Sequence, residues 1–193
     1  MTFNISNIFK VLTFESGFNF SRIKPAFLFA MFISLFTSSA AYSDNVPEYK
    51  IKAGFIYNFA RFTKWSDKEK ELKICIYGKD PFGHHIDHLN SKKVSSKTIT
   101  IQRTNIIDNL KKCHIVFLNI TPPDERQFRK IINTIKDLNI LTMSDTENAI
   151  DYGVMVGFGI KNNKVNFDIN YTSLLSSNLK INPQLIKLAK KVI

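Results

Sequence analysis

The stretch "LKICIYG", Leu72 to Gly78, decides the fold class of this chain. It is a mostly apolar run with β-branched residues that ends in glycine, the pattern of a buried strand followed by a turn. A strand that is apolar on both faces has to be covered on both faces by other elements. The stretch therefore predicts an interior strand of a sheet that carries helices on either side.

Segments with helical and strand patterns alternate around this strand. "YKIKAGFIYNFARFTKW" (Tyr49–Trp65) precedes it and has the broad apolar stripe of a helix that packs on a sheet. "DPFG" follows it, with Asp80 as the expected N-cap and Pro81 in the first helical position. Next come a strand at 97–103, a short helix at 105–113, a strand at 114–120, a helix at 121–138 and a strand at 140–145. The alternation predicts a three-layer α/β sandwich with a mostly parallel central sheet and helices on both faces.

The end of the chain departs from this alternation. Two strand-like runs flank "KNNK" within residues 154–170, which predicts a β-hairpin. "NPQLIKLAKKV" then predicts a last helix with Asn182 at its cap. We therefore expect a C-terminal β-hairpin plus helix attached to the parallel sheet.

The N-terminus has the order of a secretory signal. Arg22 and Lys24 precede the apolar run Ala26–Phe36, and small residues follow it in "TSSAAYS". The run is shorter than the ~20 residues that span a membrane. We expect residues 1–43 to be a long signal peptide that is cleaved, and residues 44–193 to be one exported domain.

The chain is strongly basic. Its formal net charge is +11, and the leader's three basic residues and one Glu account for two of these charges, which leaves +9 on residues 44–193. An exported protein of this charge suits anionic lipid headgroups, cell-wall polymers or an acidic protein surface. Nucleic acid is not expected as a partner outside the cytoplasm.

Both cysteines, Cys75 and Cys113, lie in the part that we expect to be exported. In an oxidising compartment an even pair favours a disulfide. The alternative is a pair of buried thiols on neighbouring strands.

Three of the four histidines stand close together after the "DPFG" turn. His84 and His88 are spaced i, i+4, which lets a helix present two imidazoles to one metal. A zinc site needs three or four ligands, and the sequence supplies no further one unambiguously. These two residues are therefore weak metal candidates on a solvated helix face, and we expect no metal and no cofactor.

Catalytic signatures are missing from the sequence. It contains no glycine-rich phosphate loop and no Gly-x-Ser-x-Gly elbow. Asp80, Asp145 and Asp168 fall at strand ends or in strands, where carboxylates usually serve as caps or turn residues. The sequence therefore contains no group of residues that would name a reaction, and we expect no enzyme.

Several segments in register resemble one family. These are "KAGFIYNFARFTKW", "ICIYGKDPFG", "CHIVFLN", "LTMSD", "VNFDIN" and "INPQLIKLAKKV". Together they resemble the YfiR family of periplasmic regulators over Tyr49 to Val192. The resemblance implies an exported α/β domain that represses a membrane diguanylate cyclase by binding its periplasmic part, which lowers cyclic di-GMP signalling and biofilm formation.

The resemblance also implies partners and paired cysteines. An outer-membrane lipoprotein can sequester such a repressor, and regulators of this kind can form homodimers. Cys75 and Cys113 stand where the family has its strand-to-strand disulfide. A second cysteine pair of the founding member is absent from "ENAIDYGVMVGF", which puts redox tuning through that pair in doubt.

The apolar ending of the chain is our predicted partner-binding surface. The candidate residues are Val156, Phe158, Ile160, Asp168 and Asn170. Alternatively, the apolar ones among them fill the core of the sheet. A second function stays open: a periplasmic module that binds a small ligand or cell-wall fragment in the crevice of the sheet and acts on a sensor kinase or other receptor.

Overall fold

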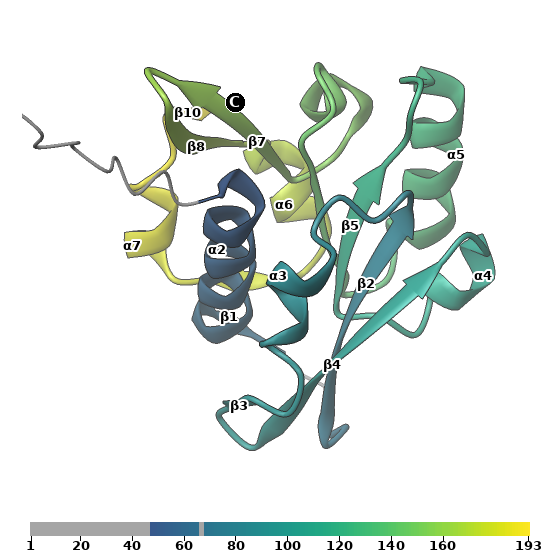
Figure 1. Ribbon diagram of the computed structural model, residues 1–193. Coiled ribbons are helices and arrows are strands. Elements are labelled where there is room, and N and C mark those ends of the chain that lie inside the picture. The colour runs from purple at the N-terminus through teal and green to yellow at the C-terminus, as the bar shows by residue number, and fades with distance from the viewer. Residues whose placement is uncertain (1–46, 66–67) are drawn as a thin grey trace, which may run out of the picture. The chain divides into compact units, whose positions relative to one another are not determined.

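A mixed eight-stranded sheet organises residues 47–65 and 68–193, the residues that the computed structural model describes (Figure 1). The expected signal peptide lies outside them. The strands follow the order β10-β8-β7-β6-β5-β2-β4-β3. Their bounds are β2 (Glu71–Gly78), β3 (Lys93–Val94), β4 (Lys97–Thr104), β5 (Ile115–Asn119), β6 (Leu141–Ser144), β7 (Val156–Lys161), β8 (Lys164–Ile169) and β10 (Lys191–Val192). A separate two-stranded ladder joins β1 (Thr63–Lys64) to β9 (Lys180–Ile181).

The five central strands are parallel, as the alternating pattern predicts. β2 pairs with β4 on one side and with β5 on the other, so the stretch Leu72–Gly78 is an interior strand. Gly78 ends it with a φ of 89°, and a Cβ there would lie 2.0 Å from the carbonyl oxygen of Asn119. Only glycine fits this close approach, which explains why the strand ends where it does.

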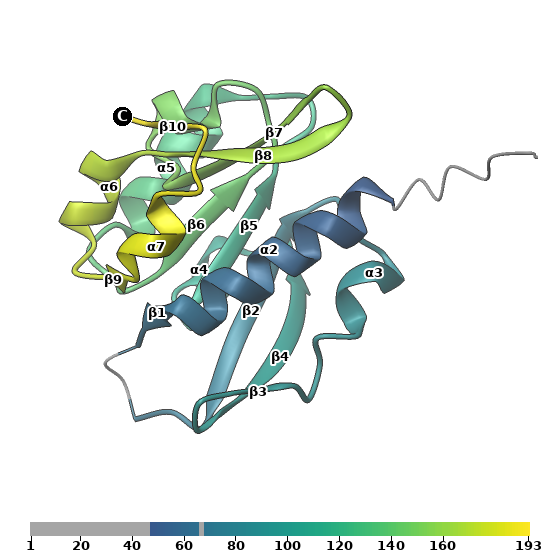
Figure 2. The same cartoon turned by 90° about the vertical axis from the view of Figure 1, so that its left-hand side faces the viewer.

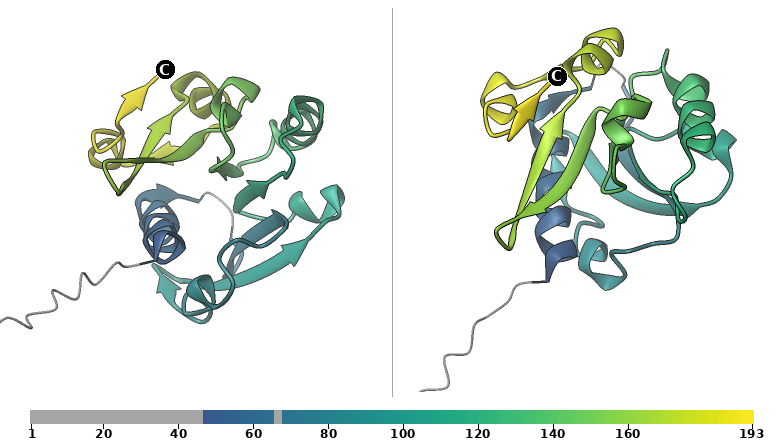
Figure 3. Two further views of the ribbon diagram at one scale, coloured as in Figure 1. Left: turned by 45° about the horizontal axis from the view of Figure 1, so that its top comes forward. Right: turned by 90° about the horizontal axis from the view of Figure 1, so that it is seen from above.

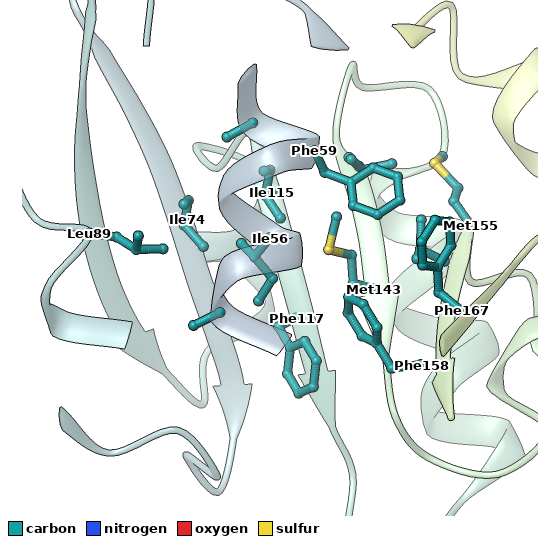
Figure 4. Close-up of a cluster of buried hydrophobic side chains, with 14 of the residues drawn as sticks. Ile56, Phe59, Ile74, Leu89, Ile115, Phe117, Met143, Met155, Phe158 and Phe167 are labelled. Carbon is teal, nitrogen blue, oxygen red and sulfur yellow. The ribbon is translucent and has the colours of Figure 1, made fainter. Parts of the chain in front are cut away.

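Helices cover both faces of the sheet (Figure 2). They are α2 (Glu48–Phe62), α3 (His84–Asp87), α4 (Ile107–Leu110), α5 (Glu125–Ile135), the 3₁₀ turn η3 (Ala149–Tyr152), α6 (Tyr171–Ser176) and α7 (Pro183–Ile186). One apolar cluster joins α2 and α3 to the sheet, and Figure 4 shows Ile56 and Phe59 of α2 within it. A second cluster joins α4 and α5 to the opposite face. The predicted three-layer sandwich is thereby confirmed.

The hairpin at the end of the sheet is confirmed as well. β7 and β8 pair antiparallel around Asn162 and Asn163. Both asparagines have positive φ, 52° and 56°, as a two-residue type I′ turn requires. Asparagine tolerates this left-handed conformation better than most residues.

Several predicted helix boundaries were wrong. The first helix ends at Phe62, because Thr63 and Lys64 pair with β9. The last helix ends at Ile186, because the next residues pair with the free edge of β8: the N–H groups of Lys190 and Ile193 donate to Phe167 and Ile169. An exposed sheet edge offers carbonyls that need donors, and this competes with continuing the helix. The helix after Gly78 begins at His84, since the Asp80 carboxylate accepts from Phe82 N–H (2.8 Å) and caps a turn instead.

Candidate functional site

The predicted contact residues are divided between core and surface. Val156 and Phe158 are buried, and the Phe158 ring packs against Phe55 of α2 and Phe167 of β8. Figure 4 shows Phe158 and Phe167 pointing into this cluster. Neither Val156 nor Phe158 offers a side-chain surface here, because strand alternation turns both toward α2. Ile160, near the hairpin tip, is 55% exposed.

A cavity of about 250 Å³ lies beside the hairpin. Gly157 and Gly159 of β7 contribute to its lining, and so do Glu147, just before η3, and Asp151 within η3. Its remaining lining residues are Thr146, Asn148, Ala149, Ile150, Phe158, Ile160, Asn166, Asp168, Lys190, Lys191 and Ile193. The cavity thus has carboxylates and lysines on its walls and can receive a polar group of a partner.

Asp168 and Asn170 have different surroundings. The Oδ1 atom of Asp168 is buried and has no hydrogen-bond donor among the described residues, and the residue lies opposite Lys191 in the β8–β10 ladder. Asn170 caps α6 by accepting from Ser173 N–H (2.8 Å) and donates to the carbonyl of Ile150 (3.0 Å). Asp168 therefore has an unused acceptor beside the cavity, whereas the side chain of Asn170 is engaged in holding α6 and η3.

A second cavity, of about 440 Å³, lies where β1 and β9 pair. Arg61, Lys64 and Lys180 line it, together with Phe62, Thr63, Ile181, Asn182 and Pro183. The Thr63 hydroxyl is buried and has no hydrogen-bond partner among the described residues. Three cations and a free hydroxyl, with no carboxylate in the lining, suit an anionic group. This site could not be predicted from the sequence, because strands of two residues are too short to show an alternating pattern.

An ion pair is buried between α2 and the end of β6. Lys52, only 2% exposed, contacts Asp145 (2.6 Å) and Glu48, and its Nζ lies 4.5 Å from the centroid of the Tyr49 ring. Burial, and then the charge of Asp145, raise the pKa of Tyr49 above its ordinary range. The helical repeat could have revealed this lysine, because it stands four residues before Ile56 on the apolar face. Both carboxylates have partners, so the cluster serves to fasten α2 to the sheet.

Cys75 and Cys113 form a disulfide. It joins β2 to the residue two positions before β5, and both cysteines are buried. The bridge thus ties together two neighbouring strands at the centre of the sheet.

His84 and His85 lie on α3 and His88 directly follows it. Arg103 of β4 holds this segment in place. The guanidinium donates to Asp80 (2.6 Å), to Asp87 (2.8 Å) and to the carbonyl of Gly83 (3.0 Å). These hydrogen bonds, first that to Asp80, raise the pKa of Arg103. His84 and His88 are exposed, and within residues 47–65 and 68–193 no three His, Cys, Asp or Glu side chains are grouped to hold a metal ion.

None of the described helices is long and apolar enough to cross a membrane.

Comparison with known protein families matches most of the chain. The family model described as YfiR/HmsC-like matches residues 49–190. The matched region begins in α2, contains the sheet through β8 and ends just before β10. It includes the disulfide, the hairpin and residues from the linings of both cavities.

Proposed function

The chain belongs to the YfiR/HmsC-like family, and from this premise we propose that it is an exported regulator that binds the periplasmic part of an inner-membrane diguanylate cyclase and represses it. Repression lowers cyclic di-GMP inside the cell and with it biofilm formation. The observation that carries the proposal is the match over residues 49–190, which spans nearly all of the described domain. In this proposal the protein acts by binding and catalyses no reaction.

The contact surface that we propose is the tip and outer face of the β7–β8 hairpin. Ile160 supplies an exposed apolar side chain there, and the adjoining cavity supplies the unused acceptor of Asp168. Val156 and Phe158 support this surface from the core. By strand alternation Ile160 lies on the same face of the hairpin as Phe158, and Asp168 lies on the opposite face. The exposed side chain of Ile160 can receive an apolar group of a partner segment, and the cavity lies on the other face.

Capture of the partner tests this function. The oxidised protein, immobilised, is exposed to the exported segments of the membrane diguanylate cyclases of the same cell. We expect specific capture of one segment, and we expect Ile160→Asp to abolish it, because a charge would be forced into an apolar contact. Failure of the folded wild-type protein to capture any cyclase segment would overturn the proposal.

Ile106→Asp is the matched control. Ile106 precedes α4, away from the hairpin, and is 60% exposed, close to the 55% of Ile160. We expect this variant to be captured like the wild type. Equal capture of both variants would remove the hairpin from the contact surface while leaving the function in place.

A second candidate function is a small-ligand module that acts on a sensor kinase or other receptor. The cavity lined by Arg61, Lys64 and Lys180 favours it, because these cations and the free hydroxyl of Thr63 suit a carboxylate or phosphate group. Inorganic phosphate and small carboxylates would then raise the melting temperature with concentration, as mass action requires.

The Arg61→Gln variant should lose this stabilisation, and Arg126→Gln should keep it. The side chain of Arg126 is 96% exposed on α5, outside the cavity. A melting temperature that stays constant at every anion concentration would rule out anion binding in this cavity.

A further inference from the structure

In the last segment of the chain, residues 170–193, all charged side chains are positive. Residues 170–193 contain four lysines, at positions 180, 187, 190 and 191, and no Asp or Glu. All four lysines are exposed. None of them takes part in an ion pair within the part of the chain that the structure describes.

The same segment exposes large apolar side chains. Of nine such residues that are exposed in the described structure, five lie here: Tyr171, Leu175, Leu188, Val192 and Ile193. Leu175 and Leu188 are 64% and 68% exposed. Single exposed leucines are ordinary, but a concentration of them among unpaired lysines is typical of a binding surface.

These residues belong to elements that lie together. Tyr171 N–H donates to the carbonyl of Ile193 (2.6 Å), which brings the start of α6 to the end of β10. Figures 2 and 3 show α6, α7, β9 and β10 gathered on one side of the described domain. We call the five apolar residues and the four lysines the C-terminal face. Lys190 and Lys191 also line the hairpin cavity, which carries the carboxylates of Glu147, Asp151 and Asp168. Lys180 and Lys187 do not line it.

We propose that the C-terminal face binds the surface of a bilayer that contains anionic phospholipids. The lysine ammonium groups meet the lipid phosphates, and the leucines and β10 residues enter the boundary between headgroups and acyl chains. Charge complementarity selects this occupant, because every charged side chain of residues 170–193 is a lysine and these lysines are mixed with apolar side chains. The inference does not rest on the proposed function. Binding to the bilayer would also hold the domain beside the exported part of a membrane partner.

Vesicle binding tests the proposal. The protein is used as cells mature it, with its N-terminus read by mass spectrometry, and is mixed with vesicles of phosphatidylcholine alone or with added phosphatidylglycerol. We expect binding only to the anionic vesicles, and weaker binding as salt rises. The triple variant Lys187→Gln, Lys190→Gln, Lys191→Gln should bind roughly tenfold or more weakly. Leu175→Ser with Leu188→Ser should also weaken binding, at unchanged charge.

The control is Lys112→Gln, Lys130→Gln, Lys136→Gln, which removes the same charge from exposed positions on or next to α4 and α5. All variants carry the same N-terminus, so any contribution of residues 1–46 to vesicle binding is the same in each of them. We expect this control to bind like the wild type. An equal loss in both triple variants, or no binding to anionic vesicles, would overturn the proposal. Protein crosslinks at Leu188 without vesicle binding would instead assign the face to a protein partner.

Discussion

At the scale of single residues, the interior of the domain holds two cross-links of different chemistry. The Cys75–Cys113 disulfide joins strands β2 and β5 on one face, and the Lys52–Asp145 ion pair joins α2 to the end of β6 on the other. Both are buried. Removing either cross-link should therefore lower the free energy of unfolding and leave the surface of the domain largely unchanged.

Replacing both cysteines, Cys75→Ala with Cys113→Ala, should lower the free energy of unfolding by about 4 kcal/mol. The bridge spans a sequence separation of 38 residues, and its loss restores the loop entropy of the unfolded chain. Urea unfolding, with reduced wild-type protein as the control, measures the change. A loss below about 1 kcal/mol would mean that the bridge adds nothing by this mechanism.

Lys52→Met should cost about 3–5 kcal/mol, because it leaves the carboxylate of Asp145 buried without a counter-charge. Adding Asp145→Asn removes that charge and should restore part of the stability. A double-mutant cycle by urea unfolding gives both values. Strictly additive losses would contradict a direct coupling between the two side chains.

The raised pKa of Tyr49 predicts a loss of stability in alkali. Its folded-state pKa lies above the unfolded value of about 10, so the contribution is complete below pH 10 and fades as pH rises toward the folded pKa. In the Tyr49→Phe variant the side chain cannot ionise, so this pH-dependent contribution to stability is absent. The stability of the variant should therefore fall less steeply above pH 10 than that of the wild type. Chemical unfolding across this range compares the two, and parallel pH profiles would be inconsistent with the shift.

At the scale of elements, turn geometry is set by a few backbone positions. Asn163→Val should lower stability by about 1–2 kcal/mol, because a β-branched residue is strained at a φ of 56°. Asn163→Gly should be neutral or stabilising. Lys161→Val, in the adjoining strand, is the matched control and should cost little. An equal cost for valine at both positions would exclude backbone strain as the cause.

Elements with strong local signals were predictable from the sequence. Buried strands such as β2 and β5, and the Asn-Asn turn, follow from runs and turn residues that act over a few positions. The pairings β1–β9 and β8–β10 were not predicted. Each joins strands that are separated in the chain, and only two residues of each strand take part, which is too few to show an alternating pattern. The same limit hid the cavity that β1 and β9 enclose.

At the scale of the whole molecule, the sequence predicts the hairpin that we propose as the contact surface, but it does not show which of the hairpin residues face the core. Phe158 and Ile160 follow the same alternation, yet the first is covered by α2 and the second lies near the tip beyond that cover. Which apolar residue remains free depends on where the helix ends above the strand. The position of the helix end over the strand is set only when the whole domain is folded, so the local sequence does not reveal it.

The central claim is that this protein represses a membrane diguanylate cyclase from outside the inner membrane. The measurement that tests it most directly is intracellular cyclic di-GMP in cells that lack the protein, compared with cells in which the wild-type or the Ile160→Asp protein is restored. We predict that cyclic di-GMP rises when the protein is absent, returns with the wild type and stays high with Ile160→Asp. A level that does not change when the protein is removed would contradict the account.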